Sequence, residues 1–263
     1  MKRNHIAALF FLVSLTTLAS CSKFTNGDPI DEHRDIGRFR AISMYNNVNV
    51  KLIQDSHPRI ALTCPRNLIE KVTTELDGDT LVIKNENDFN WLRSYDYSID
   101  MTVYFDSLSG INYASNGYLI CTDTLRGTRV VRTDTIIDGQ DTIYLPVSSN
   151  TFFLNVNEGS GNIDLTLNCD QARNRLNNGT ASVTLRGMAD YTEHLNRCYG
   201  LIHAENLQST FVRVRSESPN DIYVWSRFSL RAWIYSMGDI YYKGHPEISI
   251  EDCTSSGRVI KME

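Results

Sequence analysis

The feature that most constrains the fold is a repeat of about twenty residues in the second half of the chain. Five apolar residues recur at separations of 20, 19, 20 and 18, namely Ile163, Val183, Ile202, Ile222 and Ile240. A second apolar column keeps nearly the same steps and consists of Val156, Leu176, Leu195, Val214 and Ile234. A polar, turn-forming segment separates the two columns in every copy. Such a pattern is typical of a solenoid, in which each copy packs on the next.

Alternation of apolar and polar residues within each copy indicates strands rather than helices. Strand geometry sends Ile163 and Leu165 to one side and the residues that follow each of them to the other. Copies stacked about 4.8 Å apart pair their backbones in parallel and share one core. The sequence therefore predicts an all-β solenoid.

Two other regions carry strand signals outside the repeat. Residues 39–82 alternate apolar and polar positions, which predicts an N-terminal strand region, interrupted by one short helix over 65–72. Residues 126–147 delay the second copy of the repeat and contain Asp138-Gly139 between two Thr- and Ile-rich runs. Asp-Gly favours a tight turn between strands, so this insertion is expected to be a β-hairpin that projects from the body.

The first twenty residues have the pattern of a signal peptide. Lys2 and Arg3 precede a short apolar run, and Leu18-Ala19-Ser20-Cys21 resembles a bacterial lipobox. That resemblance implies cleavage before Cys21, a diacylglycerol on its thiol and three acyl chains in all on this residue, palmitate among them, which would anchor the protein to a membrane. Ordinary secretion with a coincidental cysteine is the alternative. We divide the chain into a signal peptide (1–20), a tether (21–37), the main domain (38–250) and a C-terminal tail (251–263).

Net charge limits the macromolecules that the protein can attract, and the cysteine spacings limit its metal sites and disulfides. A formal net charge of −5 gives no long-range attraction to nucleic acid, so no such partner is expected. Beyond residue 20, no segment approaches the roughly 20 apolar residues that span a bilayer. The remaining cysteine spacings match no zinc site and leave either one or two disulfides or unpaired buried thiols among Cys64, Cys121, Cys169, Cys198 and Cys253.

Stacking turns outward residues into surface columns, and one such face is rich in arginine. Guanidinium groups bind carboxylate or sulfate groups through paired hydrogen bonds, so an anionic glycan is a candidate ligand. The alternative is a solvated face whose charges pair with their neighbours. The residues predicted on this face are Arg173, Arg175, His194, Arg213, Arg215 and Arg231.

An outward stripe of aromatic residues follows the other apolar column, with Tyr223, Trp225 and Tyr241 as its main members. Exposed aromatic rings stack on sugars or anchor a protein partner. The alternative is packing under a cap that covers the C-terminal end of the solenoid.

Catalysis is not expected from the sequence. Polysaccharide lyases and hydrolases need clustered acids or a calcium site beside a basic residue. Asp221 and Asp239 share a slot in adjacent copies but better suit turns, and His203 with Glu205 is a weak acid/base pair. No metal-ligand run or phosphate loop is visible, so neither metal nor cofactor is expected.

Several residues together resemble one known family. Phe39 and Ile42 precede Val48 and Val50, Gly-Ser-Gly turns follow, and a closing segment reads Gly238-Asp239-Ile240-Tyr241-Tyr242-x-Gly244-x-Pro246. Over residues 38–246 this is similar to the putative auto-transporter adhesin, head GIN domain family. The resemblance implies a right-handed parallel β-helix in exported bacterial proteins that are often lipoproteins, and it transfers no catalytic residue. Arg197-Cys198-Tyr199, Glu217-Ser218-Pro219 and the insertion depart from the family pattern, so no shared ligand follows.

The sequence as a whole predicts a non-catalytic lipoprotein of the cell envelope, held by its lipid, with the outer membrane expected and the face of that membrane open. It would present its surface for adhesion, with a glycan or an envelope protein as partner. The alternative is a carbohydrate-active enzyme, a polysaccharide lyase or hydrolase, which would require a cleft with convergent acids.

Overall fold

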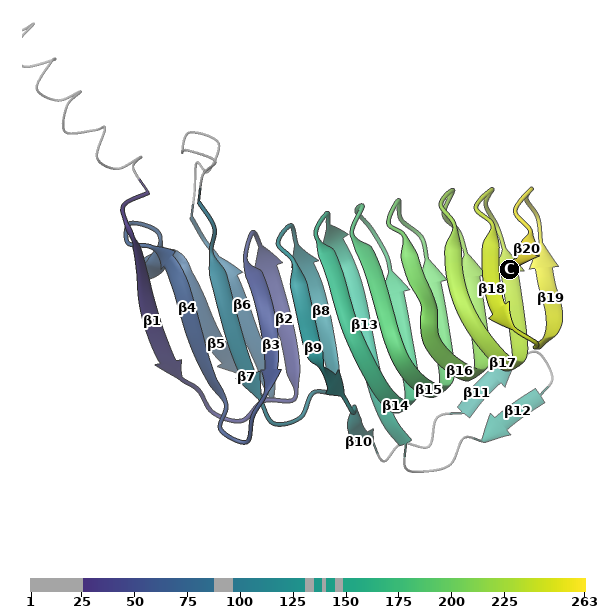
Figure 1. Ribbon diagram of the computed structural model, residues 1–263, viewed down its shortest axis with the longest axis horizontal. Coiled ribbons are helices and arrows are strands. Elements are labelled where there is room, and N and C mark those ends of the chain that lie inside the picture. Colours follow the sequence, from purple (N-terminus) through teal and green to yellow (C-terminus); the bar gives the residue numbers. More distant parts are fainter. Residues whose placement is uncertain (1–25, 88–96, 131–134, 139–140, 145–148) are drawn as a thin grey trace, which may run out of the picture.

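The computed structural model describes residues 26–87, 97–130, 135–138, 141–144 and 149–263 (Figure 1). The expected signal peptide and Cys21 lie outside these residues. The described part is all-β, with helical content limited to one 3-10 turn, η2 (Ile69–Lys71), and no helix in it is long and apolar enough to cross a bilayer. The strands are β1 (Pro29–Asp35), β2 (Ala41–Asn46), β3 (Asn49–Gln54), β4 (Arg59–Pro65), β5 (Val72–Asp77), β6 (Thr80–Asn85), β7 (Asp100–Phe105), β8 (Gly110–Ser115), β9 (Leu119–Leu125), β10 (Thr128–Val130), β11 (Thr135–Asp138), β12 (Asp141–Tyr144), β13 (Ser149–Gly159), β14 (Asn162–Leu176), β15 (Ser182–Asn196), β16 (Ile202–Ser216), β17 (Ile222–Ile234), β18 (Ile240–Gly244), β19 (Glu247–Cys253) and β20 (Val259–Lys261).

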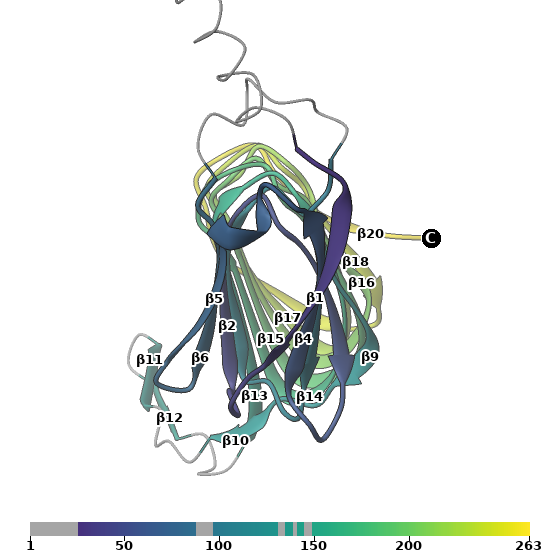
Figure 2. The ribbon, with the colours of Figure 1, turned by 90° about the vertical axis from the view of Figure 1, so that its left-hand side faces the viewer.

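Eighteen of these strands form one strongly curled sheet. The long strands β14 to β17 bend halfway, so each contributes to two walls that face each other across the core (Figure 2). The first wall contains their first halves together with β3, β9, β18 and β20. The second wall contains their second halves together with β2, β8, β13 and β19. The core lies between the walls.

The predicted stacking of the repeat in register is confirmed for the first apolar column. In the second column Leu195 and Val214 are out of register, because Asn196 and Ser216 take their places between Leu176 and Ile234. Val183 is the Cα partner of both Ile163 and Ile202, and the same column continues to Ile222 and Ile240. All five side chains are at most 1 % exposed, so this column forms part of the shared core. Burial of one such aliphatic side chain contributes about 1.5–3 kcal/mol, so the column is a large part of what holds the coils together.

The N-terminal strands do not stack in chain order. β2 lies between β6 and β8, and β3 lies between β7 and β9, all in parallel pairs. At this end the antiparallel pairs β1–β4, β4–β7 and β5–β6 close the stack. β1 falls within the segment expected to be a tether (21–37), so part of that segment belongs to the folded body. It covers the edge of β4, which would otherwise present unpaired backbone groups.

The short helix predicted over 65–72 is reduced to the three residues of η2. Pro65 does not begin a helix, because it is the last residue of β4 and is paired with Pro29. Leu68 and Ile69 are nevertheless buried. The apolar spacing in this segment therefore marks packing at a chain reversal rather than a helix.

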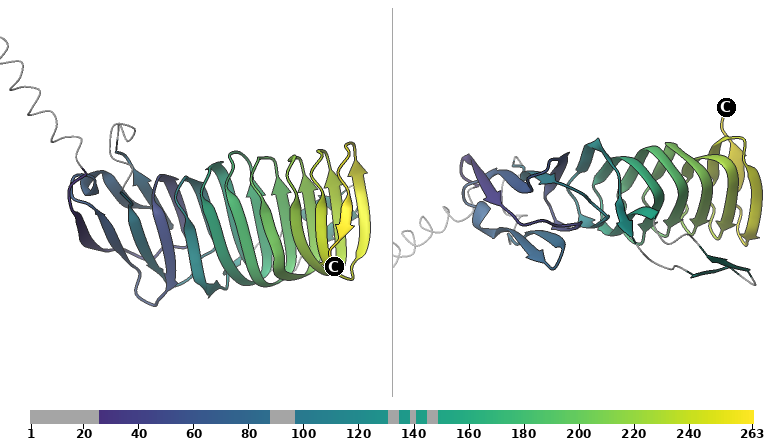
Figure 3. Two further views of the ribbon diagram at one scale, coloured as in Figure 1. Left: turned by 45° about the horizontal axis from the view of Figure 1, so that its top comes forward. Right: turned by 90° about the horizontal axis from the view of Figure 1, so that it is seen from below.

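The predicted hairpin in the insertion is confirmed. β11 and β12 pair antiparallel from Thr135 with Tyr144 to Asp138 with Asp141 and form a sheet of their own. At the base of the insertion, β10 pairs antiparallel with the start of β13. Figure 3 shows the hairpin outside the stacked coils.

The sheet continues beyond the boundary expected at residue 250, because β19 and β20 supply strands of a last coil. Within the described residues β19 pairs only with β17, so its outer edge carries no further strand. Ile248 and Ile250 continue the core columns of Leu230 and Ala232 but are 39 % and 54 % exposed. The C-terminal end of the stack is therefore open, whereas the N-terminal end is closed by antiparallel strands.

Glycine at position 187 is predicted to be required by the close approach of neighbouring coils. Gly187 has φ +104, and a Cβ there would lie 2.0 Å from the carbonyl oxygen of Leu167. Gly187→Ala should therefore lower the free energy of unfolding by about 3 kcal/mol, from backbone strain and the contact together. Urea unfolding with analysis of both midpoint and slope measures this loss.

Gly78→Ala is the matched control. Gly78 has φ +61 and open space around it, so only the backbone conformation penalises a side chain, by about 1–2 kcal/mol. Equal losses in the two variants would contradict the role given to coil contact at Gly187.

Candidate functional site

An arginine-rich surface covers the outside of the second wall. Alternation points every second residue outward, and parallel register places these residues in columns. One column contains Phe153, Arg173, Glu193, Arg213 and Arg231, and the other contains Asn155, Arg175, Leu195, Arg215 and Trp233. Arg197 lies in the turn beside them and was missed by the sequence reasoning. We call this surface the arginine face, and its arginines are Arg173, Arg175, Arg197, Arg213, Arg215 and Arg231.

The prediction that His194 belongs to this face is wrong. His194 lies in the core and is 1 % exposed. The apolar pattern of the sequence aligns Leu195 with Leu176 at a step of 19, whereas β15 follows β14 at a constant step of 20, so Asn196 is opposite Leu176. Leu195 therefore lies in an outer column, and the side chain before it points inward. An apolar residue on the outer side of the sheet supplied the misleading signal.

Glutamates neutralise part of the arginine face. Glu217 accepts hydrogen bonds from Arg215 Nε at 2.5 Å and from Arg197 Nε at 3.1 Å. Burial acts to raise the pKa of Glu217, but these hydrogen bonds outweigh it and hold the pKa below its usual value. The further ion pairs are Arg231 Nε with Glu251 Oε1 at 2.8 Å, and Arg173 Nε with Glu193 Oε2 at 3.8 Å.

Two arginines of the face, Arg175 and Arg213, have no carboxylate partner within the described residues. The guanidinium of Arg213 lies 4.3 Å from the ring centroid of Trp233, which is a cation–π contact. Arg175 is exposed. Within the described residues, Glu217 is the ion-pair partner of Arg197 and Arg215, and Arg175 and Arg213 have none, so these four guanidinium groups leave an excess of positive charge.

The arginine face contains a groove of about 410 Å³. Asparagine amides line one end, where Asn155 Nδ2 donates to Asn112 Oδ1 at 3.1 Å and Asn177 Nδ2 donates to Asn157 Oδ1 at 3.1 Å. The amides hold each other in place, and Arg175 lies in the same lining. Fixed amide and guanidinium donors suit a carboxylate, sulfate or phosphate group.

The predicted aromatic stripe on the first wall is a stack of rings. The centroids of His203 and Tyr223 are 4.9 Å apart, and those of Tyr223 and Tyr241 are 5.1 Å apart, with interplanar angles of 8° and 13°. Both tyrosines are half-buried. Ring faces in such a stack cover each other, so the stripe presents ring edges to a ligand rather than open faces.

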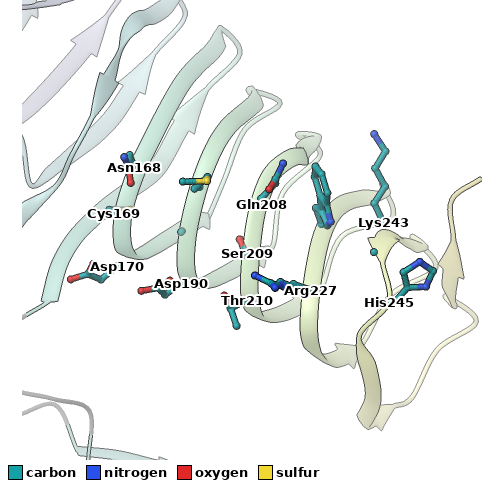
Figure 4. A pocket seen from close by; sticks show the side chains of 14 residues that line it. Asn168, Cys169, Asp170, Asp190, Gln208, Ser209, Thr210, Arg227, Lys243 and His245 are labelled. Atoms are coloured by element: carbon teal, nitrogen blue, oxygen red, sulfur yellow. The ribbon is translucent and has the colours of Figure 1, made fainter.

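Trp225 takes no part in this stack and lines a trough at the bend between the two walls. Figure 4 shows this trough, with Gln208 and Lys243 among its labelled residues. The trough has a volume of about 720 Å³. Small residues in one column underlie it, namely Cys169, Ala189, Ser209, Ser226 and Gly244. Larger residues flank that column, with Asn168, Met188, Gln208, Trp225 and Lys243 on one rim and Asp170, Asp190, Thr210 and Arg227 on the other.

The carboxylates considered for catalysis have structural partners. Asp221 Oδ1 accepts the backbone N–H of Asp239 at 2.8 Å, and Asp239 Oδ1 accepts the backbone N–H of Arg258 at 2.8 Å. Both therefore tie one turn to the next, as the sequence reasoning expected. His203 Nδ1 lies 3.5 Å from Glu205 Oε1. The described residues contain no group of three or more His, Cys, Asp or Glu that is placed to hold a metal ion.

The five cysteines of the domain are free thiols, so the alternative of unpaired thiols is the one that the structure shows. Cys64, Cys121, Cys169 and Cys198 are buried, and Cys253 is exposed. Burial raises the pKa of Cys64 to about 11 and the pKa values of Cys121 and Cys169 to about 12. The buried thiols therefore act as small apolar residues rather than as nucleophiles.

The family described as putative auto-transporter adhesin, head GIN domain matches residues 38–246. The chain belongs to this family. Its head GIN domain spans the curled sheet from just before β2 to the turn before β19, so the arginine face and the trough both lie within it. No protein with a curated description matches the sequence.

Several solved structures have the fold of this head GIN domain. A putative adhesin from Bacteroides fragilis is 19 % identical, with a TM-score of 0.75 over 90 % of this chain and 99 % of that chain. A putative lipid binding protein from Parabacteroides distasonis is 20 % identical, with a TM-score of 0.59 over 90 % and 98 % of the two chains. A putative adhesin from Parabacteroides merdae is 17 % identical, with a TM-score of 0.55 over 91 % and 98 %. At these identities the likeness establishes the fold alone.

His194 is predicted to make the stability of the domain fall in mild acid. Burial lowers the pKa of His194 to about 4 from a usual value of 6.5. The unfolded chain therefore binds a proton more readily, and stability that is complete above about pH 6.5 is lost as the pH falls toward 4, by roughly 3 kcal/mol in all. Urea unfolding at intervals between pH 7 and pH 4 measures the slope.

The His194→Leu variant serves as the comparison, because its side chain cannot titrate. Its unfolding free energy should depend less on pH over this interval than that of the unmodified chain. Identical slopes for the two proteins would show that His194 does not carry the effect.

Proposed function

We propose that this chain is a non-catalytic adhesion protein of the cell envelope that binds an anionic partner at its arginine face. The observation that carries the proposal is the groove of about 410 Å³, whose lining contains four arginines, Arg175, Arg197, Arg213 and Arg215, and one glutamate, Glu193. Its family is described as an adhesin, and its solved relatives are described as putative adhesins and a putative lipid binding protein. Those descriptions suggest an envelope location and name no enzyme.

The chemistry of the groove selects for acidic groups. Arg175 is exposed and has no carboxylate partner in the described part of the chain, and the neighbouring asparagines supply fixed amides. A ligand with repeated carboxylate, sulfate or phosphate groups can contact Arg175 and Arg213 together. An acidic glycan and an anionic lipid headgroup share this chemistry.

The envelope location follows from an export signal and a lipid anchor at Cys21. The lipobox pattern supports the anchor, and β1 begins only eight residues after Cys21. Anchoring there keeps the closed N-terminal end near the bilayer, with the outer membrane as the expected one. We assign the curled sheet to a right-handed parallel β-helix, a reading supported by the constant parallel step of 20 residues between β14 and β15.

The enzyme alternative, a polysaccharide lyase or hydrolase, has no supporting observation in the described residues. The carboxylates of Asp221 and Asp239, which were considered for catalysis, accept backbone hydrogen bonds in turns.

Arg175→Ala is expected to weaken anion binding about tenfold, because it removes a charge-assisted contact of about 1.4 kcal/mol. The purified full chain carrying Cys21→Ser, which removes the acylation site, is titrated with a heparin-derived hexasaccharide in a calorimeter. In a parallel arm it is floated with vesicles of phosphatidylglycerol or of phosphatidylcholine. Binding to the hexasaccharide identifies a glycan source of the acidic groups, and selective binding to phosphatidylglycerol identifies a lipid source.

Arg186→Ala is the matched control, because Arg186 is an exposed arginine of the first wall that forms an ion pair with Asp164. It should leave anion binding unchanged. The proposal is refuted by a folded chain that binds neither probe at low salt, or by equal losses in the Arg175 and Arg186 variants.

Acylation at Cys21 is tested by growing cells that express the chain with an alkyne-labelled palmitate. The unmodified chain is expected to carry the label and to fractionate with membranes, because the acyl chains insert into the bilayer. Cys21→Ser should lose both properties, whereas Cys253→Ser should keep them. Label in the Cys21 variant would contradict the anchor.

A further inference from the structure

The trough at the bend between the walls is a second surface, separate from the arginine face. It crosses five successive strands, β14 to β18, and therefore runs along the axis of the stack. Its depth follows from the column of small residues beneath it, while larger side chains stand on both sides. Figure 4 shows Asp170, Asp190 and Thr210 in a row along one side, with Gln208 and Lys243 on the other. The trough is thus an elongated cavity rather than a pit.

Five polar side chains on the rims of the trough have no hydrogen-bond or ion-pair partner within the described residues. They are the side chains of Asp190, Gln208, Thr210, Arg227 and Lys243. The arginine face differs, because most of its charges are paired with glutamate. These five side chains offer carboxylate, amide, hydroxyl and cationic groups, which together donate to and accept from a ligand rich in hydroxyl groups.

Charge is balanced along the trough. Asp170 and Asp190 lie toward one end, and Arg227 and Lys243 lie toward the other (Figure 4). A strongly anionic polymer is repelled at the acidic end, and a strongly cationic one is repelled at the basic end. The lining therefore favours an occupant with little net charge, unlike the arginine face.

An apolar section lies within the polar lining. Trp225 and Met188 flank Gln208 in the same rim column, and Trp225 is half-buried while Met188 is 56 % exposed. An indole beside amides and carboxylates is the combination that holds a sugar ring, which has an apolar face and hydroxyl edges. Groups on the rim recur at the strand spacing of about 4.8 Å, a distance close to the length of one pyranose unit.

We propose that the trough binds a linear, electrically neutral saccharide chain that lies along the stack axis. Hydroxyl groups of successive sugars contact Asp190, Thr210 and Gln208, and one ring packs on Trp225. This inference goes beyond the proposed anion binding, since it assigns a different ligand class to a different surface.

The test is calorimetric titration of the full chain carrying Cys21→Ser with neutral hexasaccharides of glucose, of N-acetylglucosamine and of mannose. At least one is expected to bind, and to bind more tightly than its disaccharide, because the trough spans several coils. Trp225→Ala should weaken that binding about tenfold, and Gln208→Ala about fivefold. Gln208 is exposed, so its variant keeps the test valid if removal of the indole disturbs folding.

Arg175→Ala separates this inference from the proposed function. It should leave neutral-saccharide binding unchanged, while Trp225→Ala should leave binding of the heparin-derived hexasaccharide unchanged. The inference is overturned if the folded chain binds none of the neutral hexasaccharides at millimolar concentration. It is equally overturned if binding persists in both the Trp225 and Gln208 variants, or if hexasaccharides bind no more tightly than disaccharides.

Discussion

Parallel backbone pairing between successive coils is the interaction on which the rest of the structure depends. Between β14 and β15 the step stays at 20 residues from Asn162 opposite Ser182 to Leu176 opposite Asn196. The pairs of β16 with β15 and with β17 contain bulges, but regular pairing resumes beyond each bulge, so side chains of successive coils still meet in columns. The core column, the arginine face, the stacked rings and the trough all depend on these columns.

Parallel pairing also brings like charges close together, as it does for Arg213 opposite Arg231, and elsewhere the columns show how the sequence limits that cost. Arg173, Glu193 and Arg213 alternate in sign along one column. In the adjacent column Leu195 lies between Arg175 and Arg215 and separates two positive charges. Opposite or neutral neighbours across strands are favourable, whereas like charges directly opposite each other are destabilising. The outward position of Leu195 therefore has an electrostatic reason as well as a geometric one.

The repeat itself could be predicted from the sequence because its evidence is local and periodic. The column through Val183 and the hairpin at Asp138 both follow from spacing and turn chemistry. The side of His194 could not be predicted, because a difference between steps of 19 and 20 exchanges the two faces of a strand. The trough was missed for a related reason: Trp225 was noticed, but the bend that places small residues beside it leaves no periodic signal.

The order of the N-terminal strands in the sheet could not be predicted from the sequence either. β2 enters between β6 and β8, an arrangement that depends on contacts between distant segments rather than on any local pattern. The same limit applies to β1, whose polar sequence resembles a linker and whose place in the sheet is set by the edge of β4.

The two ends of the stack differ in whether a further strand could be added to the sheet. Antiparallel strands at one end present no parallel template, while β19 at the other displays Ile248, Ile250 and a row of free backbone groups. A strand that arrived there would extend the existing ladder without rearranging any coil already formed. The described part of the molecule is polar in the sense of a filament, with a terminated end at the N-terminal strands and an extensible one at β19.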